Sequence, residues 1–282
     1  MKAVAIAAAT AALWSLQGTA SASVYAGHSG WFWGNPLPQG NTLRAVAFTG
    51  NRGYAVGDFG TVMRSDDGGT SWIGITTATT TALQVVEVIA PDTIVVGGGC
   101  VAQRSDDAGR SFVPLPWTPA GSACRSQVKS LAFPSAAIGY LLLSDGSVLR
   151  TRDGGNSWAA RTAIPGTPAT SPGSKTHATE IQFPGPDVGI AATEAGMLYR
   201  TTDGGISWSP VAESTQHLDS ISFPDALTGY AAGGASVLKT EDGGLTWTQQ
   251  GVVQPPASIH WIRCADALRC VAVTARGDQL LR

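Results

Sequence analysis

Charged side chains are scarce in this chain. They make up only 13% of the 282 residues, with 18 basic against 20 acidic side chains, whereas glycine occurs 35 times. The near balance of the two signs lacks the basic excess of proteins that bind nucleic acids, so we expect no nucleic acid partner. Abundant glycine with few charges favours tightly turning β-structure over a helical or disordered protein.

Long hydrophobic runs are absent beyond the first residues. Lys2, an apolar run over residues 3–16 and the small residues Ala20-Ser-Ala22 are typical of a secretory signal peptide. The apolar run is too short to span a bilayer. We expect residues 1–22 to be removed and residues 23–282 to form one exported domain, periplasmic or secreted, that does not span the membrane. An uncleaved anchor is the alternative.

Motifs of catalysis and metal binding are also missing. The chain has no nucleophile elbow, phosphate-binding loop or dinucleotide fingerprint. Its four cysteines and four histidines include no C-x-x-C or H-x-x-x-H pair, which argues against a zinc site. The carboxylates outside the repeated turns stand singly rather than as the pair a glycosidase needs: Asp58, Glu87, Asp145, Glu180, Glu194 and Asp219. We expect no catalytic residue, no metal and no cofactor.

One short phrase is written five times. The copies are Ser65–Trp72, Ser105–Phe112, Thr151–Trp158, Thr201–Trp208 and Thr240–Trp247. Their aspartates are 40, 46, 50 and 39 residues apart: Asp67, Asp107, Asp153, Asp203 and Asp242. Repetition at this period indicates supersecondary units that are stacked or arranged radially, because one unit alone cannot bury its apolar face.

Each phrase predicts a tight turn between two strands. Glycine supplies positive φ, the aspartate bonds its own backbone, and the Ser or Thr two residues earlier adds a second local bond. The closing aromatic packs under the loop; four are tryptophans, Trp72, Trp158, Trp208 and Trp247. The pattern S/T-x-D-x-G-x-S/T-W resembles the Asp-box, or BNR repeat, of β-propellers. Because the turns are spread around a ring, we expect a structural role for their aspartates.

The flanking sequence predicts four antiparallel strands per unit, which is one propeller blade. The four strands of a unit are called a to d in chain order. Residues 85–97 fit the pattern of strands a and b at an offset of 40 from residues 45–57, and residues 262–282 supply strands a, b and c of a sixth unit. The aromatic segment Trp31–Trp33 resembles a strand d without its blade. We therefore predict six blades, closed by the N-terminal strand. A chain truncated at Arg282 and lacking a seventh blade is the alternative.

Export permits disulfide bonds. Cys264 and Cys270 stand where other units carry the strand-a phenylalanine and the strand-b glycine, which face each other across a short hairpin. We predict a bond between them. Cys100 and Cys124 flank the second turn, and their pairing is plausible on weaker geometric grounds.

Two sets of residues are candidates for binding a partner. The first is a basic residue before each turn: Arg64, Arg104, Arg150, Arg200 and Lys239. These side chains can lie along a neighbouring blade, or they can form a cationic band for an acidic partner. The second set enters strand a in each unit, where it can surround the mouth of the channel: Arg44, Gln84, Lys129, Thr179, Asp219 and His260. A solvated loop edge is the alternative.

Asp-box propellers include sialidases, but this chain has no Arg-Ile-Pro element, and packing explains four of its five tyrosines: Tyr54, Tyr140, Tyr199 and Tyr230. From Trp31 to Arg282 the sequence resembles the photosystem II assembly and stability factor family. That resemblance implies an exported, non-catalytic propeller that binds another protein, such as a subunit of a membrane complex, and a role for an arginine patch in binding. Members are usually seven-bladed. We expect a monomeric scaffold; a sialidase-like hydrolase or glycan-binding propeller is the alternative, and a purely structural module of a surface assembly is a third.

Overall fold

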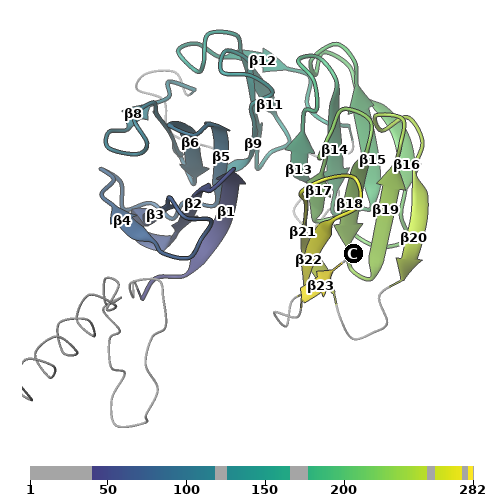
Figure 1. Ribbon diagram of the computed structural model, residues 1–282. Coiled ribbons are helices and arrows are strands. Elements are labelled where there is room, and N and C mark those ends of the chain that lie inside the picture. Colours follow the sequence, from purple (N-terminus) through teal and green to yellow (C-terminus); the bar gives the residue numbers. More distant parts are fainter. Residues whose placement is uncertain (1–39, 118–125, 166–176, 253–257, 275–278, 282) are drawn as a thin grey trace, which may run out of the picture.

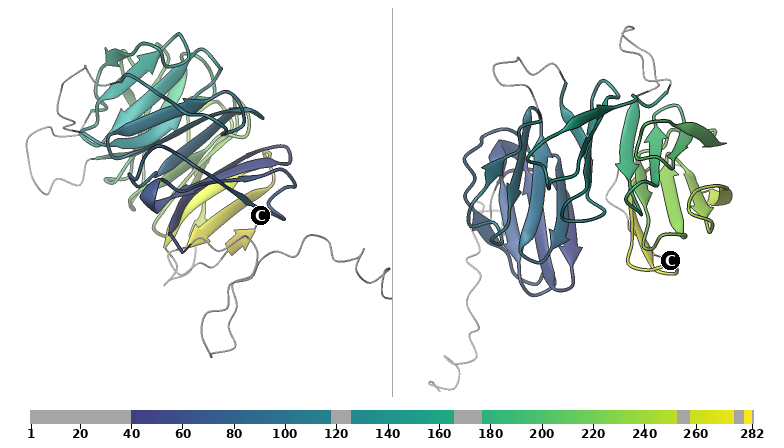
Figure 2. Two further views of the ribbon diagram at one scale, coloured as in Figure 1. Left: turned by 90° about the vertical axis from the view of Figure 1, so that its left-hand side faces the viewer. Right: turned by 90° about the horizontal axis from the view of Figure 1, so that it is seen from above.

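A computed structural model describes residues 40–117, 126–165, 177–252, 258–274 and 279–281. These residues form six antiparallel sheets arranged around a central axis (Figures 1 and 2). Five sheets have four strands and one has three, each built from consecutive strands of the chain. The prediction of an all-β propeller with four-stranded antiparallel blades is therefore confirmed.

The first three blades occupy the N-terminal half. Blade 1 contains β1 (Leu43–Thr49), β2 (Arg52–Gly57), β3 (Val62–Ser65) and β4 (Ile73–Ile75), with a 3-10 turn at Asp58–Gly60. Blade 2 contains β5 (Val85–Ala90), β6 (Thr93–Gly98), β7 (Val101–Ser105) and β8 (Val113–Pro114). Blade 3 contains β9 (Val128–Ala132), β10 (Gly139–Leu143), β11 (Val148–Thr151) and β12 (Ala159–Arg161).

Two further four-stranded blades and a three-stranded sheet, called blade 6 here, follow in order, and the count of six closed blades stays a prediction. Blade 4 contains β13 (Ala178–Gln182), β14 (Gly189–Thr193), β15 (Met197–Thr201) and β16 (Ser209–Glu213). Blade 5 contains β17 (Ser220–Ser222), β18 (Gly229–Gly233), β19 (Ser236–Thr240) and β20 (Thr248–Val252). Blade 6 contains β21 (Ile259–Cys264), β22 (Cys270–Thr274) and β23 (Gln279–Leu281). In these described ranges no helix has the length and apolar character needed to cross a membrane.

The core lies between blades. Each second strand is covered on both faces, so β10 is buried along its whole length, as are β14 and β18. Tyr140 and Leu142 of β10 pack against blade 4, while Leu141 and Leu143 pack against blade 2. The first strand of each blade is innermost and contacts the first strand of the next, which builds the lining of a central channel.

Blade 2 departs from the predicted register by one residue. A Cβ on Gly57 would lie 2.1 Å from the Thr42 carbonyl oxygen, and a Cβ on Gly98 would lie 2.2 Å from that of Ala82. Gly98, rather than Gly97, is therefore the equivalent of Gly57. The first hairpin of blade 2 has one extra residue, in a β-bulge between Val88 and Ala90 of β5, which a constant offset of 40 overlooks.

One face of blade 1 is less covered than its counterparts. Leu43, Val46 and Phe48 of β1 are 43%, 36% and 46% exposed, whereas Ile181 and Phe183, equivalent to the last two, are 0% and 6% exposed. The last sheet of the chain has three strands among the described residues. The predicted closing strand, Trp31–Trp33, and the predicted signal peptide lie outside the described residues.

Candidate functional site

The repeated Asp turns join the third and fourth strands of their blades. They lie at the end of each sheet where the innermost strand finishes, opposite the end where it starts. In the first copy the Ser65 hydroxyl donates to Asp67 Oδ1 at 2.8 Å, and Gly69 N–H donates to Ser65 Oγ at 2.8 Å. The Ser71 hydroxyl and N–H also donate to Asp67, at 2.5 and 2.8 Å. The carboxylate is thus held by its own turn.

The same bonds recur in the other four turns. The hydroxyl of the seventh residue of each phrase donates to the aspartate at 2.5–2.6 Å. Hydrogen bonds to the ionised form, led by this hydroxyl, lower the pKa of each aspartate to about 2: Asp67, Asp107, Asp153, Asp203 and Asp242. None of the five lines the central cavity described below.

The closing tryptophans tie the turns to the innermost strands. Each ring packs edge-on against a phenylalanine of its own blade at 5.7–6.3 Å between centroids: Phe48–Trp72, Phe133–Trp158, Phe183–Trp208 and Phe223–Trp247. Trp72, Trp158 and Trp247 also donate from Nε1 to the second glycine of their turn. These contacts hold each turn against the innermost strand of its own blade.

The basic residues before the turns reach across to the next blade. Each guanidinium donates to a backbone carbonyl there, at 2.9–3.2 Å: Arg64 to Ala108, Arg104 to Ala136 and Gly154, Arg150 to Pro186, and Arg200 to Gly243. Lys239 pairs with Glu241 at 2.5 Å and lies 5.8 Å from the Tyr230 ring. The contacts of the four arginines favour the interpretation that these side chains join neighbouring blades, whereas the contacts given for Lys239 lie within blade 5. Partner binding by this band stays a prediction.

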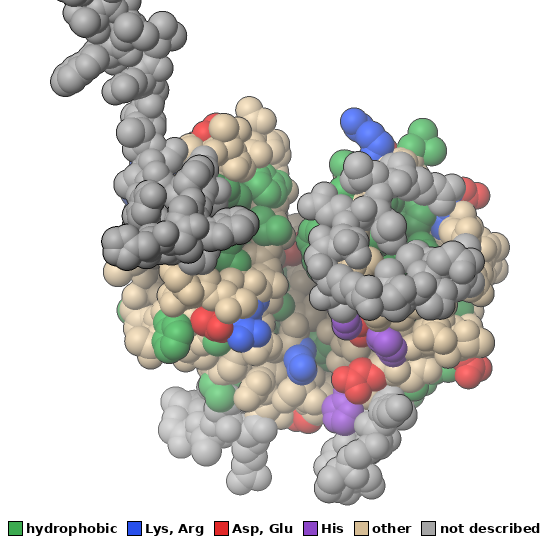
Figure 3. Space-filling model, turned by 90° about the horizontal axis from the view of Figure 1, so that it is seen from below, with side chains coloured by type: hydrophobic (Ala, Val, Ile, Leu, Met, Phe, Trp, Pro, Cys, Tyr) green, Lys and Arg blue, Asp and Glu red, His purple; other side chains and the backbone are tan. Residues whose placement is uncertain are grey.

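The six innermost strands converge on one cavity of about 200 Å³. Five of the six residues that the repeat alignment places at the channel mouth line it: Arg44, Gln84, Lys129, Thr179 and Asp219. The sixth, His260, lies beside them and bonds to Asp219 through Nδ1 at 2.9 Å. Figure 3 shows this end of the molecule, hollowed between two lobes, with charged and histidine side chains around the hollow.

Charges at the mouth are unevenly paired. Arg44 forms a two-point ion pair with Asp58, at 2.5 and 3.2 Å. Asp219 lies between two imidazoles, with His217 Nε2 at 3.3 Å on its other side. Lys129 is exposed and has no ion-pair partner in the part of the chain that the structure describes. At the mouth, the ammonium of Lys129 is therefore left without an ion pair to any described carboxylate.

Deeper in the channel the structure corrects the expectation that the carboxylates stand singly. Glu87 of β5 and Glu180 of β13 line the same cavity, although they are far apart in sequence. Arg263 Nη2 pairs with Glu180 at 2.7 Å, and its guanidinium lies 5.0 Å from the Trp261 ring. Burial raises the pKa of Glu87 to about 7, and Glu180 adds to the rise, while Arg263 and the N–H of Phe133 oppose it.

These carboxylates share a structural task that sequence reasoning missed. An innermost strand has an unpaired edge, so its backbone N–H groups need acceptors. Side chains of the preceding blade supply them at two repeat positions. At the first position, nearer the start of the strand, three side chains accept a backbone N–H: Ser130 accepts that of Ile181, Glu180 that of Ile221 and Ser220 that of Ile262. At the second position, two residues further along the strand, Glu87 accepts the backbone N–H of Phe133, Gln182 that of Phe223 and Ser222 that of Cys264. Polar residues inside an apolar strand-a pattern were the available signal.

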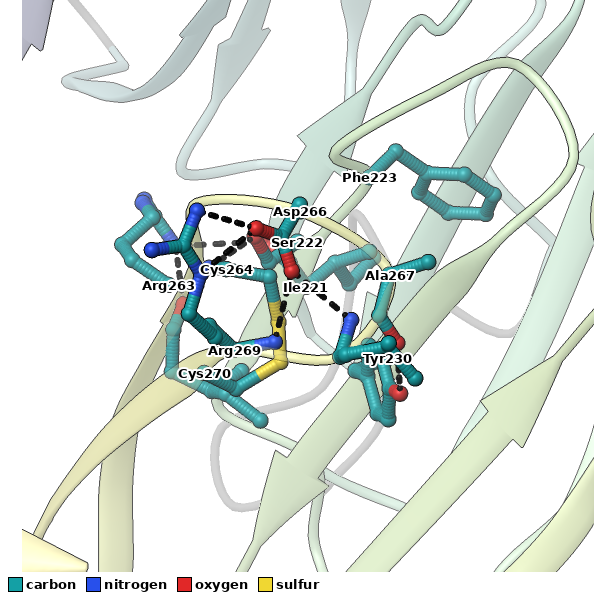
Figure 4. The surroundings of a disulfide bond; sticks show 12 residues. Ile221, Ser222, Phe223, Tyr230, Arg263, Cys264, Asp266, Ala267, Arg269 and Cys270 are labelled. Carbon is teal, nitrogen blue, oxygen red and sulfur yellow. Dashed lines mark hydrogen bonds and ion pairs between the residues drawn. A yellow bond between two sulfur atoms is a disulfide. The ribbon is translucent and has the colours of Figure 1, made fainter. Parts of the chain in front are cut away.

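Cys264 and Cys270 form a disulfide across the first hairpin of blade 6, next to Tyr230 of blade 5 (Figure 4). The Tyr230 hydroxyl donates to the Ala267 carbonyl in that hairpin at 2.9 Å. Cys100 is also disulfide-bonded, and its predicted partner, Cys124, lies outside the described residues. Within the described ranges, no cluster of three or more His, Cys, Asp or Glu side chains could hold a metal ion.

Comparison with known proteins gives a family match. The sequence model of a family described as photosynthesis system II assembly factor YCF48 matches residues 113–278, more than half of the chain. Among curated proteins, no sequence matches.

Solved structures share the fold at low identity. A structure titled YCF48 bound to D1 peptide is 19% identical with a TM-score of 0.50, over 86% of this chain and 94% of that one. YCF48 from Cyanidioschyzon merolae is 22% identical with a TM-score of 0.50, over 87% and 96%. A GH74 xyloglucanase from Xanthomonas campestris is 18% identical with a TM-score of 0.64, over 86% of this chain but only 43% of the enzyme.

Proposed function

This chain belongs to the family of the photosystem II assembly factor YCF48, and from that premise we propose that it is a non-catalytic, exported propeller that binds a segment of a partner protein at its channel mouth. The partner class is a subunit of a membrane complex. A solved YCF48 carries a D1 peptide, which makes a peptide of that kind the first ligand to test.

The observation that carries this proposal is the convergence of six strands on one polar cavity. The Asp turns, by contrast, use their carboxylates for hydrogen bonds within each turn. The mouth combines the unpaired Lys129 with the His217–Asp219–His260 group, so it presents both signs of charge to an extended segment. Mixed polar groups at a concave site fix the orientation of a ligand.

The test is a binding titration. Fluorescein-labelled peptides that tile the D1 protein are titrated with the full chain, and fluorescence anisotropy is recorded. We expect at least one peptide to bind, and Lys129→Ala to weaken it three- to tenfold, roughly 0.6–1.4 kcal/mol for a partly exposed charge pair. Arg110→Ala, which removes an exposed cation of the second Asp turn, is the matched control and should bind normally. Absence of binding by every peptide, or equal binding by both variants, contradicts the proposal.

We also propose that the ring is closed by the chain's own N-terminal segment, with Trp31–Trp33 as the fourth strand of blade 6. The uncovered apolar side chains of β1 and the three-stranded last sheet support this. Deletion of residues 23–39 should lower the melting temperature and increase binding of an apolar dye. An unchanged melting temperature contradicts closure. Export is tested separately, by N-terminal sequencing of the secreted or periplasmic protein, which should begin at residue 23.

A carbohydrate-active propeller is the second candidate, and one observation favours it: Glu87 and Glu180 share a cavity. Their environments differ, because Glu180 is paired with Arg263 whereas burial raises the pKa of Glu87. Such separation is found in acid and base pairs of glycosidases. Both carboxyl groups already accept a backbone N–H, however, which accounts for them structurally. Release of reducing sugar from xyloglucan by the wild-type chain, lost in Glu180→Gln, would favour the enzyme.

A further inference from the structure

Glu87 is a carboxylate where an amide would suffice. It and Gln182 occupy the same repeat position, and each accepts the N–H of a phenylalanine in the following blade. Gln182 Oε1 accepts from Phe223 N–H at 3.2 Å, so a neutral side chain satisfies the strand edge. A carboxylate at this depth costs more to desolvate than an amide. The cap therefore explains an acceptor at position 87 but leaves its charge unexplained.

Glu87 forms no ion pair of its own in the described part of the chain. Arg263, from β21, acts on Glu87 at a distance, but its Nη2 pairs with Glu180 at 2.7 Å. Its Nη1 is shared among Ser220 Oγ and the carbonyls of Ile221 and Ile262, at 2.8–3.0 Å. One guanidinium thus serves two carboxylates, those of Glu87 and Glu180. Lys129 of β9 lines the same cavity at its mouth, without being among the charges that act on Glu87.

The cavity limits the size of what can be added. At about 200 Å³ it is below the roughly 300–1,000 Å³ of pockets for drug-sized ligands, and it suits one long side chain. Trp261 lines its wall and offers an apolar surface for an alkyl stem. Long cationic side chains combine such a stem with a charged tip.

We propose that the channel takes one organic cation, the ammonium or guanidinium of a lysine or arginine side chain in the bound segment, and that Glu87 is its counter-ion. This rests on the proposed function for the source of the side chain. The cation lies between Glu87 and the mouth, where Lys129 is left to meet an acidic group of the same segment.

Small cations test the site independently of any peptide. Calorimetric titration of the full chain with n-butylammonium and n-butylguanidinium, with n-pentanol as the neutral control, should show binding of the cations alone. Glu87→Gln should weaken them at least tenfold, about 1.4 kcal/mol, while the melting temperature is unchanged because Gln keeps the cap. Ser222→Ala, which removes a neutral cap at the same repeat position, should bind cations like the wild type. Equal binding by wild type and Glu87→Gln overturns the inference, as does absence of cation binding.

A second measurement does not depend on the variant. Carboxyl carbon NMR of the wild type should place the pKa of Glu87 above its ordinary value, and butylammonium should lower it. Cation binding should therefore strengthen between pH 6 and 8 in the wild type and lose this dependence in Glu87→Gln, which assigns the dependence to Glu87. A Glu87 resonance indifferent to butylammonium contradicts the site.

Peptides separate the two proposals. A tiling peptide that binds should contain lysine or arginine, and replacement of that residue by norleucine should weaken it tenfold in the wild type and much less in Glu87→Gln. If a peptide binds without either residue, or binds Glu87→Gln normally, the proposed function stands and the cation site falls. If no peptide binds but butylammonium depends on Glu87, the cation site stands and the proposed function falls.

Discussion

Replacement of Arg150 by alanine distinguishes a structural band of arginines from a partner-binding one. Arg150 is 3% exposed and joins blade 3 to blade 4. Its Nη2 donates to the Pro186 carbonyl at 3.2 Å and pairs with Asp187 at 2.8 Å, and the guanidinium lies 5.4 Å from the Tyr140 ring centroid. All these contacts are lost in Arg150→Ala.

The expected loss of stability follows from those contacts. A hydrogen bond to a charged group is worth about 1.5–3 kcal/mol, and a cation–π contact adds about 0.5–2 kcal/mol. Asp187 is 55% exposed, so its ion pair adds little. The buried Nε has no acceptor among the described residues, which offsets part of the gain. We expect Arg150→Ala to lower the free energy of unfolding by about 2–4 kcal/mol.

Urea denaturation followed by tryptophan fluorescence measures this loss. Arg152→Ala is the matched control: it removes an exposed arginine two residues away and should change the free energy of unfolding by less than about 0.5 kcal/mol. The reasoning is refuted if Arg150→Ala unfolds at the wild-type urea concentration. Should that variant also lose peptide binding, the arginine band acts on the partner, as the family resemblance implies.

Three further predictions concern the same scaffold. The pKa values of the Asp-turn carboxylates lie at about 2, below the ordinary 3.8, so the stability that these carboxylates give the fold is fully present above about pH 4 and is lost as the pH falls toward 2. In thermal melts, Asp153→Asn should therefore be less stable than the wild type at pH 7, and the two melting temperatures should converge near pH 2. The Cys264→Ala/Cys270→Ala variant removes a crosslink between residues six apart and should lose about 2 kcal/mol in urea titrations run without reductant; no loss would show that the hairpin is held by its other contacts. A Cβ on Gly139 would lie 2.3 Å from the Phe133 ring, so Gly139→Ala should cost about 1–3 kcal/mol, while Gly185→Ala, with nothing nearer than 4.0 Å, should be close to neutral in the same assay.

Local chemistry made much of the fold predictable. Each Asp turn carries its own hydrogen-bonding partners within seven residues, so Ser65, Asp67 and Ser71 could be read without knowledge of the rest. The Cys264–Cys270 pairing followed from the same logic, because two repeat positions face each other across one hairpin. The blade-2 register failed for the complementary reason. Its extra residue is a bulge in β5, which shows in the strand pairing and in which glycine meets a neighbouring carbonyl.

The site was only half predictable. Alignment of the repeats placed Arg44, Lys129 and Asp219 at one level, and the structure gathers them at the channel mouth. The meeting of Glu87 with Arg263 could not be anticipated in the same way, since it depends on how far two side chains from blades 2 and 6 reach across the channel. The direction of the arginine side chains likewise depends on the neighbouring blade, because its backbone carbonyls accept their hydrogen bonds.

Many polar side chains of the channel serve the fold itself. The innermost strands turn an edge toward the axis, and Ser220, Ser222 and Gln182 are there because that edge needs acceptors. The informative residues are those whose chemistry exceeds this need. Glu87 offers an ionisable carboxyl group that its cap does not require, and Lys129 carries a charge that no described side chain pairs with. A ligand that supplies opposite charges would pair with both groups, which is why we propose these two residues, rather than the more numerous arginines between the blades, as the place where a partner binds.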